Sequence, residues 1–209
     1  MSSPPRTVVL DCVGTLFSYS ALFTAIDTRL GDKLRVEGVK PILFGYIRIE
    51  VAEREYIYLS MSGKYHSFAT ILQALFWRDA DFDCTMKGYR ALELRKGAKE
   101  CFEKLRSAGF RVIGFTMGDV ERIGEYFMNA GVDMSEGDLL SCDSSRIGKP
   151  DPEAYRPLLE ELSREGGEPW FAAAHMWDVS AAKRKGFKGA YCSSDTLPEM
   201  ADKIIATSK

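Results

Sequence analysis

The chain has 209 residues, of which 45% are hydrophobic, so it is long enough for one well-buried core or for a core with an inserted subdomain. Its formal net charge of -2 gives no general field that would attract nucleic acid or an anionic membrane. No apolar run approaches the length of a membrane span, and the polar stretch 1–6 lacks an apolar signal region behind it. We therefore expect a cytoplasmic protein with a small-molecule substrate, and no nucleic-acid or membrane partner.

The first predicted element is a short buried strand that runs directly into a carboxylate. Val8, Val9 and Leu10 form an apolar run typical of an inner parallel strand, and Asp11 ends it. Gly14 lets the chain turn away without covering the carboxylate. At the carboxyl end of a parallel strand, Asp11 would lie in the crevice where open α/β sheets bind ligands. The alternative is an aspartate that only caps a turn.

Residues 18–89 show apolar positions at helical spacing and no comparable strand, which predicts an inserted helical subdomain. Its aromatic residues are expected mainly in the core of that subdomain: Tyr46, Tyr56, Tyr58, Tyr65, Phe68, Phe76 and Trp77.

Strands and helices alternate again after Gly97. Helices are predicted over 98–108, 120–130, 153–164 and 179–185, and strands over 111–116, 139–141, 170–175 and 189–192. Asp119 is expected to cap the helix that follows it. Right-handed crossovers would bring four polar side chains to one edge of a parallel sheet: Asp11, Thr116, Lys149 and Asp178.

Two carboxylates, a lysine and a hydroxyl in one crevice suit covalent catalysis by an aspartate. Lys149 would hold Asp11 ionised and aligned, and Thr116 would bind an oxygen or a carboxylate of the substrate. Asp178 would either anchor the lysine or activate water. The five cysteines lack a CxxC pair and are expected to be free thiols, with Cys12 beside the candidate nucleophile.

In chain order, these residues resemble the four motifs of the haloacid dehalogenase superfamily. The motifs are Asp11-x-x-Gly14-Thr15, the hydroxyl of Thr116, Lys149-Pro150-Asp151-Pro152-x-x-Tyr155, and Trp177-Asp178. The last two are similar to those of the type II L-2-haloacid dehalogenase branch. The resemblance implies an α/β fold with a Rossmann-like parallel sheet core, formed by residues 1–17 and 90–209, and a helical cap formed by residues 18–89.

The resemblance also implies a hydrolase in which Asp11 displaces halide from a small organic substrate and water then cleaves the aspartyl ester. Thr15, Met117, Tyr155 and Trp177 would contact the substrate. No cofactor and no metal are expected, because Val13 stands where phosphatase members carry a second aspartate. A homodimer through the helical block is a further expectation from the resemblance.

Several positions depart from the pattern of that branch, namely Val13, Met117, Ala173 and His175. Met117 and Ala173 make the pocket more apolar, and burial there would raise the pKa of Asp11. An alternative hypothesis is therefore a non-hydrolytic enzyme in which Asp11, Lys149 and His175 promote an isomerisation or an epoxide rearrangement of an apolar metabolite, as in secondary metabolism. His175 is equally interpreted as a structural histidine. A third hypothesis is a catalytically silent binding protein.

The arginine with which that branch receives the substrate carboxylate has no clear counterpart in the helical block. Lys33, Arg35 and Arg48 are the candidates.

Overall fold

The structure, a computed structural model, describes residues 6–75, 79–164, 166–193 and 195–208. The chain forms two compact units, one of Met1–Phe17 with Leu94–Lys209 and one of Ser18–Glu93. The sequence-based boundaries lay after residue 17 and between residues 89 and 90. β2 and β3 pair in a two-stranded sheet where the chain passes between the units; they span Phe17–Ser18 and Glu93–Leu94.

The larger unit is built on a five-stranded sheet of order β5-β4-β1-β6-β7, in which the neighbouring strands run parallel. The predicted α/β fold is therefore confirmed. The strands are β1 (Arg6–Asp11), β4 (Phe110–Thr116), β5 (Leu139–Ser141), β6 (Trp170–Ala173) and β7 (Lys188–Tyr191).

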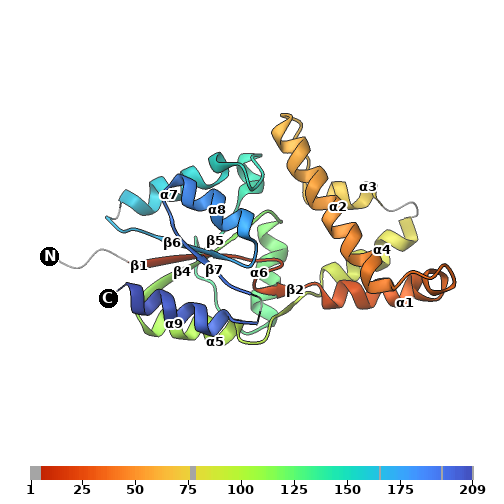
Figure 1. Ribbon diagram of the computed structural model, residues 1–209, viewed down its shortest axis with the longest axis horizontal. Coiled ribbons are helices and arrows are strands. Elements are labelled where there is room, and N and C mark those ends of the chain that lie inside the picture. The colour runs from red at the N-terminus through yellow and green to blue at the C-terminus, as the bar shows by residue number, and fades with distance from the viewer. Residues whose placement is uncertain (1–5, 76–78, 165, 194, 209) are drawn as a thin grey trace. The chain divides into compact units, whose positions relative to one another are not determined.

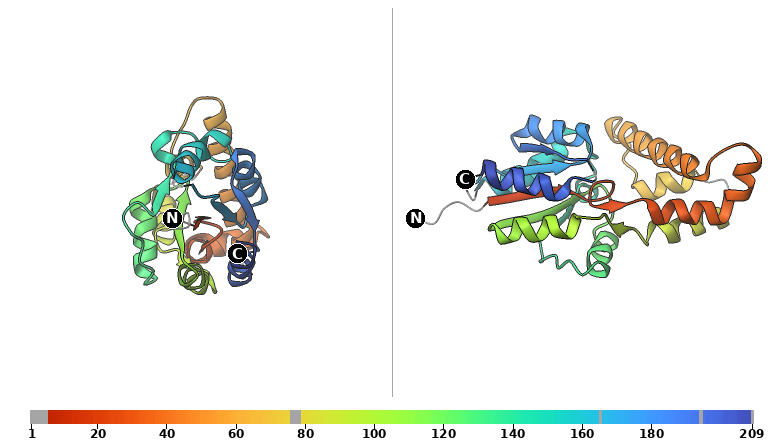
Figure 2. Two further views of the ribbon diagram at one scale, coloured as in Figure 1. Left: turned by 90° about the vertical axis from the view of Figure 1, so that its left-hand side faces the viewer. Right: turned by 60° about the horizontal axis from the view of Figure 1, so that its bottom comes forward.

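Helices cover both faces of this sheet. α7 and α8 lie on one face, and α5 and α9 lie on the other (Figures 1 and 2). The helices of this unit are α5 (Ala98–Ser107), α6 (Val120–Asn129), η1 (the 3₁₀ turn Cys142–Ser145), α7 (Pro152–Arg164), α8 (Met176–Lys185) and α9 (Leu197–Thr207).

The strand order changes direction at β1, which pairs with β4 on one side and with β6 on the other. In open α/β sheets, the crevice beyond the carboxyl end of such a strand is where ligands bind. The middle of β1 is fully buried, and its residues Val8, Val9 and Leu10 have no exposed surface. Asp11 ends the strand opposite Phe115 of β4.

The smaller unit is helical, as predicted for residues 18–89. α1 packs against both α2 and α4, and α2 packs against α3. Its helices are α1 (Ser20–Val36), α2 (Pro41–Met61), α3 (Phe68–Ala74) and α4 (Asp79–Tyr89).

The expectation that aromatic residues of this unit lie in its core is correct for Tyr56 and Phe68, which are buried. It is wrong for Tyr46 and Tyr58, which are 50% and 59% exposed on α2, although Tyr46 keeps one contact with the ring of Phe23. Phe76 and Trp77 lie outside the described residues.

Two boundaries near the candidate site differ from the sequence-based prediction. β6 ends at Ala173, and α8 begins at Met176, three residues before the predicted start at Val179. Asp178 therefore lies in the first turn of α8. Lys149 follows the turn η1 and does not end a strand directly. Within the ranges that the structure describes, no helix is long and apolar enough to cross a membrane.

Candidate active site

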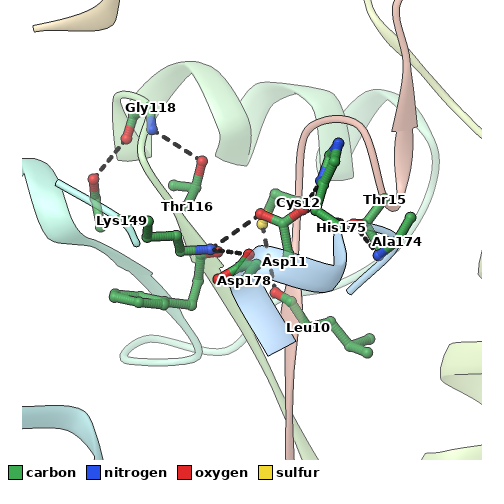
Figure 3. A network of polar contacts seen from close by, with 12 residues as sticks. Leu10, Asp11, Cys12, Thr15, Thr116, Gly118, Lys149, Ala174, His175 and Asp178 are labelled. Carbon is green, nitrogen blue, oxygen red and sulfur yellow. Dashed lines mark hydrogen bonds and ion pairs between the residues drawn. The ribbon is translucent and has the colours of Figure 1, made fainter. Parts of the chain in front are cut away.

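Lys149 lies at the centre of a buried polar network below the carboxyl end of β1 (Figure 3). Its ammonium donates to Asp11 Oδ1 at 3.1 Å, to Asp178 Oδ2 at 3.0 Å and to the carbonyl oxygen of Phe115 at 2.9 Å. A lysine has three such donors, so all of them are used. The rings of Phe115 and Phe171 lie 4.8 and 5.2 Å from the ammonium. This side chain is fully buried and held in one position.

Asp178 anchors the lysine from the first turn of α8. Its side chain has no exposed surface, and its Oδ1 accepts a hydrogen bond from the Tyr155 hydroxyl. Tyr155 is itself fully buried against Phe115 and Phe171. The prediction that Tyr155 contacts the substrate is therefore corrected: it supports Asp178 from below.

Thr15 fixes the second oxygen of Asp11. Its hydroxyl donates to Asp11 Oδ2 at 2.6 Å and accepts from the amide of Ala174 at 2.9 Å. Because the amide can only donate, the single hydroxyl hydrogen of Thr15 goes to Asp11. Thr15 has no exposed surface, so the predicted substrate contact is corrected to a role in orienting the carboxylate.

His175 lies beside the same oxygen of Asp11, at the open side of the site. Its Nδ1 is 3.7 Å from Asp11 Oδ2, and 32% of its side chain is exposed. The imidazole stacks on Trp177 with ring centroids 5.4 Å apart. Gly14, at φ 88°, makes room for the ring, since a Cβ at that position would lie 2.6 Å from His175 Cε1.

These contacts set the protonation states of the site. Burial opposes ionisation of Asp11, but the Lys149 ammonium, the neighbouring His175 imidazole and the hydrogen bond from Thr15 lower its pKa to about 2. Burial likewise disfavours the Lys149 ammonium, but the two carboxylates raise its pKa. Burial raises the pKa of Asp178 to about 6. The expected rise in the pKa of Asp11 is thus wrong. Burial in an apolar pocket would raise this pKa, but the buried Lys149 ammonium beside Asp11 outweighs that effect.

The loop after β4 is organised by main-chain contacts. The Thr116 hydroxyl accepts from the amide of Gly118 at 3.0 Å, and the Ser141 hydroxyl donates to the carbonyl of Gly118 at 2.7 Å. Met117 packs against the hydrophobic core of the sheet. Asp119 accepts from the amide of Arg122, so its predicted role as the cap of α6 is confirmed.

Sequence reasoning missed the main-chain partners of this network. The carbonyl of Phe115 and the amide of Ala174 are supplied by the backbone, and no side-chain pattern signals them. The Ser141 hydroxyl, at the end of β5, was also missed. Its position at the end of the predicted strand 139–141 was the one available signal.

The remaining candidates are placed as follows. Arg35 pairs with Asp27 and Asp32 on the surface of the helical unit, and the Arg48 guanidinium lies over the ring of Phe44. Lys33 is exposed.

The five cysteines are free, as expected. Cys12 is buried, and burial together with the Asp11 carboxylate raises the pKa of its thiol. In the part of the chain that the structure describes, no group of three or more His, Cys, Asp or Glu residues could hold a metal ion.

As a chemical unit, the network presents an ionised, oriented carboxylate with an imidazole beside it. The lysine compensates the buried charge, and the two oxygens of Asp11 are held by different donors. Such a carboxylate is suited to attack an electrophilic carbon.

Known proteins with similar sequences are dehalogenases. (S)-2-haloacid dehalogenase 4A of Burkholderia cepacia is 31% identical over 105 residues, which are 50% of this chain and 46% of that enzyme. Haloacetate dehalogenase H-2 of Moraxella sp. (strain B) is 39% identical over 87 residues, which are 40% of this chain and 38% of that enzyme. The chain thus spans about half, or less, of the length of these curated relatives.

The fold is also similar to that of solved dehalogenases. The L-2-haloacid dehalogenase from Xanthobacter autotrophicus matches with a TM-score of 0.75 and 21% identity, covering 90% of this chain and 77% of that one. A second structure of that enzyme, with chloropropionic acid covalently bound, matches with a TM-score of 0.72. At this level of identity, the likeness shows the fold.

A family model for haloacid dehalogenase-like hydrolases matches residues 5–203. This match covers nearly the whole chain and includes every residue of the Asp11, Lys149 and Asp178 network. The chain therefore belongs to the haloacid dehalogenase-like hydrolases.

Proposed function

We propose that the protein is a 2-haloacid dehalogenase-like hydrolase that acts through a covalent ester on Asp11. The observation that carries the proposal is the Asp11 carboxylate itself: it is kept ionised by a buried lysine and oriented by Thr15 at the carboxyl end of the central strand. Two similar sequences are named as dehalogenases of haloacids, which supports this choice of substrate class.

In the first step, an oxygen of Asp11 attacks the carbon that carries the halogen. The new carbon–oxygen bond forms as the carbon–halogen bond breaks, and halide leaves with the electron pair. In the second step, water attacks the carboxyl carbon of Asp11 and releases a 2-hydroxy acid. The oxygen of water therefore remains in Asp11, and the oxygen in the product comes from the enzyme.

Lys33, Arg35 and Arg48 stay candidates for binding the substrate carboxylate.

Turnover in H₂¹⁸O tests this proposal. The wild-type chain and Asp11→Asn are each offered 2-haloacids, and halide release is measured together with the mass of the peptide that contains Asp11. We expect halide release only from wild type, with ¹⁸O in Asp11. An unlabelled Asp11 in an enzyme that turns over would refute the ester. A product of unchanged mass that requires Asp11 would instead support acid–base rearrangement, the second candidate, which His175 beside Asp11 favours.

We also propose that the protein forms a homodimer through the outer face of α2. Leu43, Ile47 and Met61 are more than half exposed there, and such an apolar stripe on a helix is typical of an interface. An antiparallel pairing of two copies of α2 around the level of Ala52 would place the exposed Glu50 opposite Arg54 of the second copy. Opposite charges at symmetric positions make the face self-complementary.

Light scattering across a concentration series measures this association. We expect Glu50→Arg and Arg54→Glu each to weaken the dimer and the double exchange to restore it. A wild-type chain that is monomeric at all concentrations would refute the dimer.

We further propose a cytoplasmic location, supported by five free thiols, which a reducing compartment preserves.

A further inference from the structure

We propose that His175 is the general base of the second half-reaction, taking a proton from the water that attacks the aspartyl ester. The inference rests on the proposed function, because it needs an ester on Asp11. It assigns to His175 the water-activating role that the sequence offered as one of two alternatives for Asp178.

Asp178 is not placed to activate water. Its side chain has no exposed surface, its Oδ1 accepts from the Tyr155 hydroxyl, and its Oδ2 accepts from Lys149 at 3.0 Å. Both oxygens therefore face protein groups, and with no exposed surface neither oxygen contacts solvent. A water molecule at the open side of Asp11 does not reach Asp178 without a rearrangement of this buried network.

His175 has the position that Asp178 lacks. Its Nδ1 lies 3.7 Å from Asp11 Oδ2, and about a third of its side chain is exposed, so solvent reaches the imidazole next to the carboxyl group of Asp11. A group within one water molecule of the reacting atoms satisfies the geometric requirement for a general base. A neutral imidazole has one nitrogen that accepts a proton, and its ordinary pKa lies near neutrality.

The surroundings of His175 also hold it over the site. The imidazole stacks on Trp177 at an interplanar angle of 23°, and both residues belong to the β6–α8 connection and the first turn of α8. On the other side, Gly14 approaches so closely that any side chain there would meet the ring. Figure 3 shows the imidazole directed toward the carboxylate of Asp11. A histidine that merely filled space would need neither the exposure nor this direction.

The step balances as follows. The oxygen of water forms a bond to Cγ of Asp11, and its proton passes to the imidazole. The bond between Cγ and the substrate oxygen then breaks, and the electron pair leaves with that oxygen. The alkoxide takes the proton from the imidazolium, which restores the neutral imidazole and leaves Asp11 as a carboxylic acid that holds the second hydrogen of water. Beside Lys149 this acid ionises, and its proton passes to solvent, which regenerates the Asp11 carboxylate.

The test separates the two half-reactions in the full-length chain. Wild type, His175→Asn and, as the matched control, the exposed His66→Asn are mixed with 2-chloropropionate or 2-bromopropionate and quenched at intervals. Halide release is measured together with the intact mass of the protein. His66 is the only other histidine of the chain.

We expect wild type and His66→Asn to turn over without a lasting adduct. His175→Asn should release about one halide per chain and keep the ester, with steady-state turnover lower by about 10²–10⁴-fold, which is the usual contribution of a general base. In His175→Gly, added imidazole should speed the loss of the adduct.

Two results would overturn the assignment. One is His175→Asn turning over like wild type, and the other is loss of the first halide itself, which would place His175 in the first step. If wild type gives neither halide nor adduct, the proposed function fails, and this inference fails with it. The behaviour of wild type therefore distinguishes the two failures.

Discussion

Lys149 is the residue whose removal should perturb the site most, because two buried carboxylates depend on it. We consider Lys149→Met, which keeps most of the side-chain volume and removes the charge. Asp11 and Asp178 then share one pocket without a cation. Burial and mutual repulsion would raise the pKa of both carboxyl groups.

The size of the effect follows from the contacts. The lowering of the Asp11 pKa from 3.8 to about 2 corresponds to about 2 kcal/mol in favour of its charged form, and Lys149 is the main favourable contribution. Removing one partner of a buried ion pair usually destabilises a protein by about 3–5 kcal/mol. We expect a loss in this range near neutral pH.

The free energy of unfolding should depend on pH differently in wild type and in Lys149→Met. In wild type, the lowered pKa of Asp11 contributes stability above pH 3.8, and this is lost as pH falls toward 2. The raised pKa of Asp178 makes stability decline between pH 3.8 and about 6. Above that window, the two groups leave wild-type stability flat. In Lys149→Met both pKa values are raised, so its stability should keep falling as pH rises from about 6.5 to about 8.5.

Urea unfolding at several pH values measures this difference. The exposed Lys64→Met serves as the control for loss of a lysine and should behave like wild type. Adding Asp178→Asn to Lys149→Met should flatten part of the slope, because one of the two stranded carboxylates is gone. A Lys149→Met variant that stays flat above pH 6.5 would refute the account of the network.

Three further outcomes are expected. Thr15→Val should lower the free energy of unfolding by about 1–3 kcal/mol, because the amide of Ala174 loses its acceptor, whereas Thr15→Ser should retain it; similar losses in both would contradict this. Gly14→Ala should reduce turnover and stability more than Gly63→Ala, a glycine of similar φ with nothing within 4 Å of its added Cβ. The buried Cys12 should resist a thiol reagent in the folded protein and react in denaturant, as peptide mapping would record.

The site residues that could be predicted from sequence are those next to a clear hydrophobic pattern of a strand or a helix. Asp11 follows an unbroken buried strand, and Asp119 precedes an amphipathic helix that it caps. The pairing of Lys149 with both carboxylates was also predictable, since a lysine within an apolar α/β core requires a negative partner.

Contacts between distant backbone groups could not be predicted in this way. The amide of Ala174 meets the Thr15 hydroxyl across 159 positions of sequence, and any residue except proline would supply the same amide. The early start of α8 was missed because His175, at its N-cap, makes no capping hydrogen bond with its side chain. The usual start signal of a helix is thus absent at the point where the site is built.

The burial of the Lys149 network is better explained by a role in catalysis than by a contribution to the stability of the fold. Replacing a buried ion network with apolar residues of similar volume is often neutral or stabilising, so stability alone does not require Lys149 and Asp178. What the network does provide is a carboxylate on Asp11 that stays ionised although almost entirely dehydrated. A dehydrated carboxylate does not have to shed water before it attacks carbon. Because Asp178 has no exposed surface, proton transfer falls to a group on the open side of Asp11, where His175 lies.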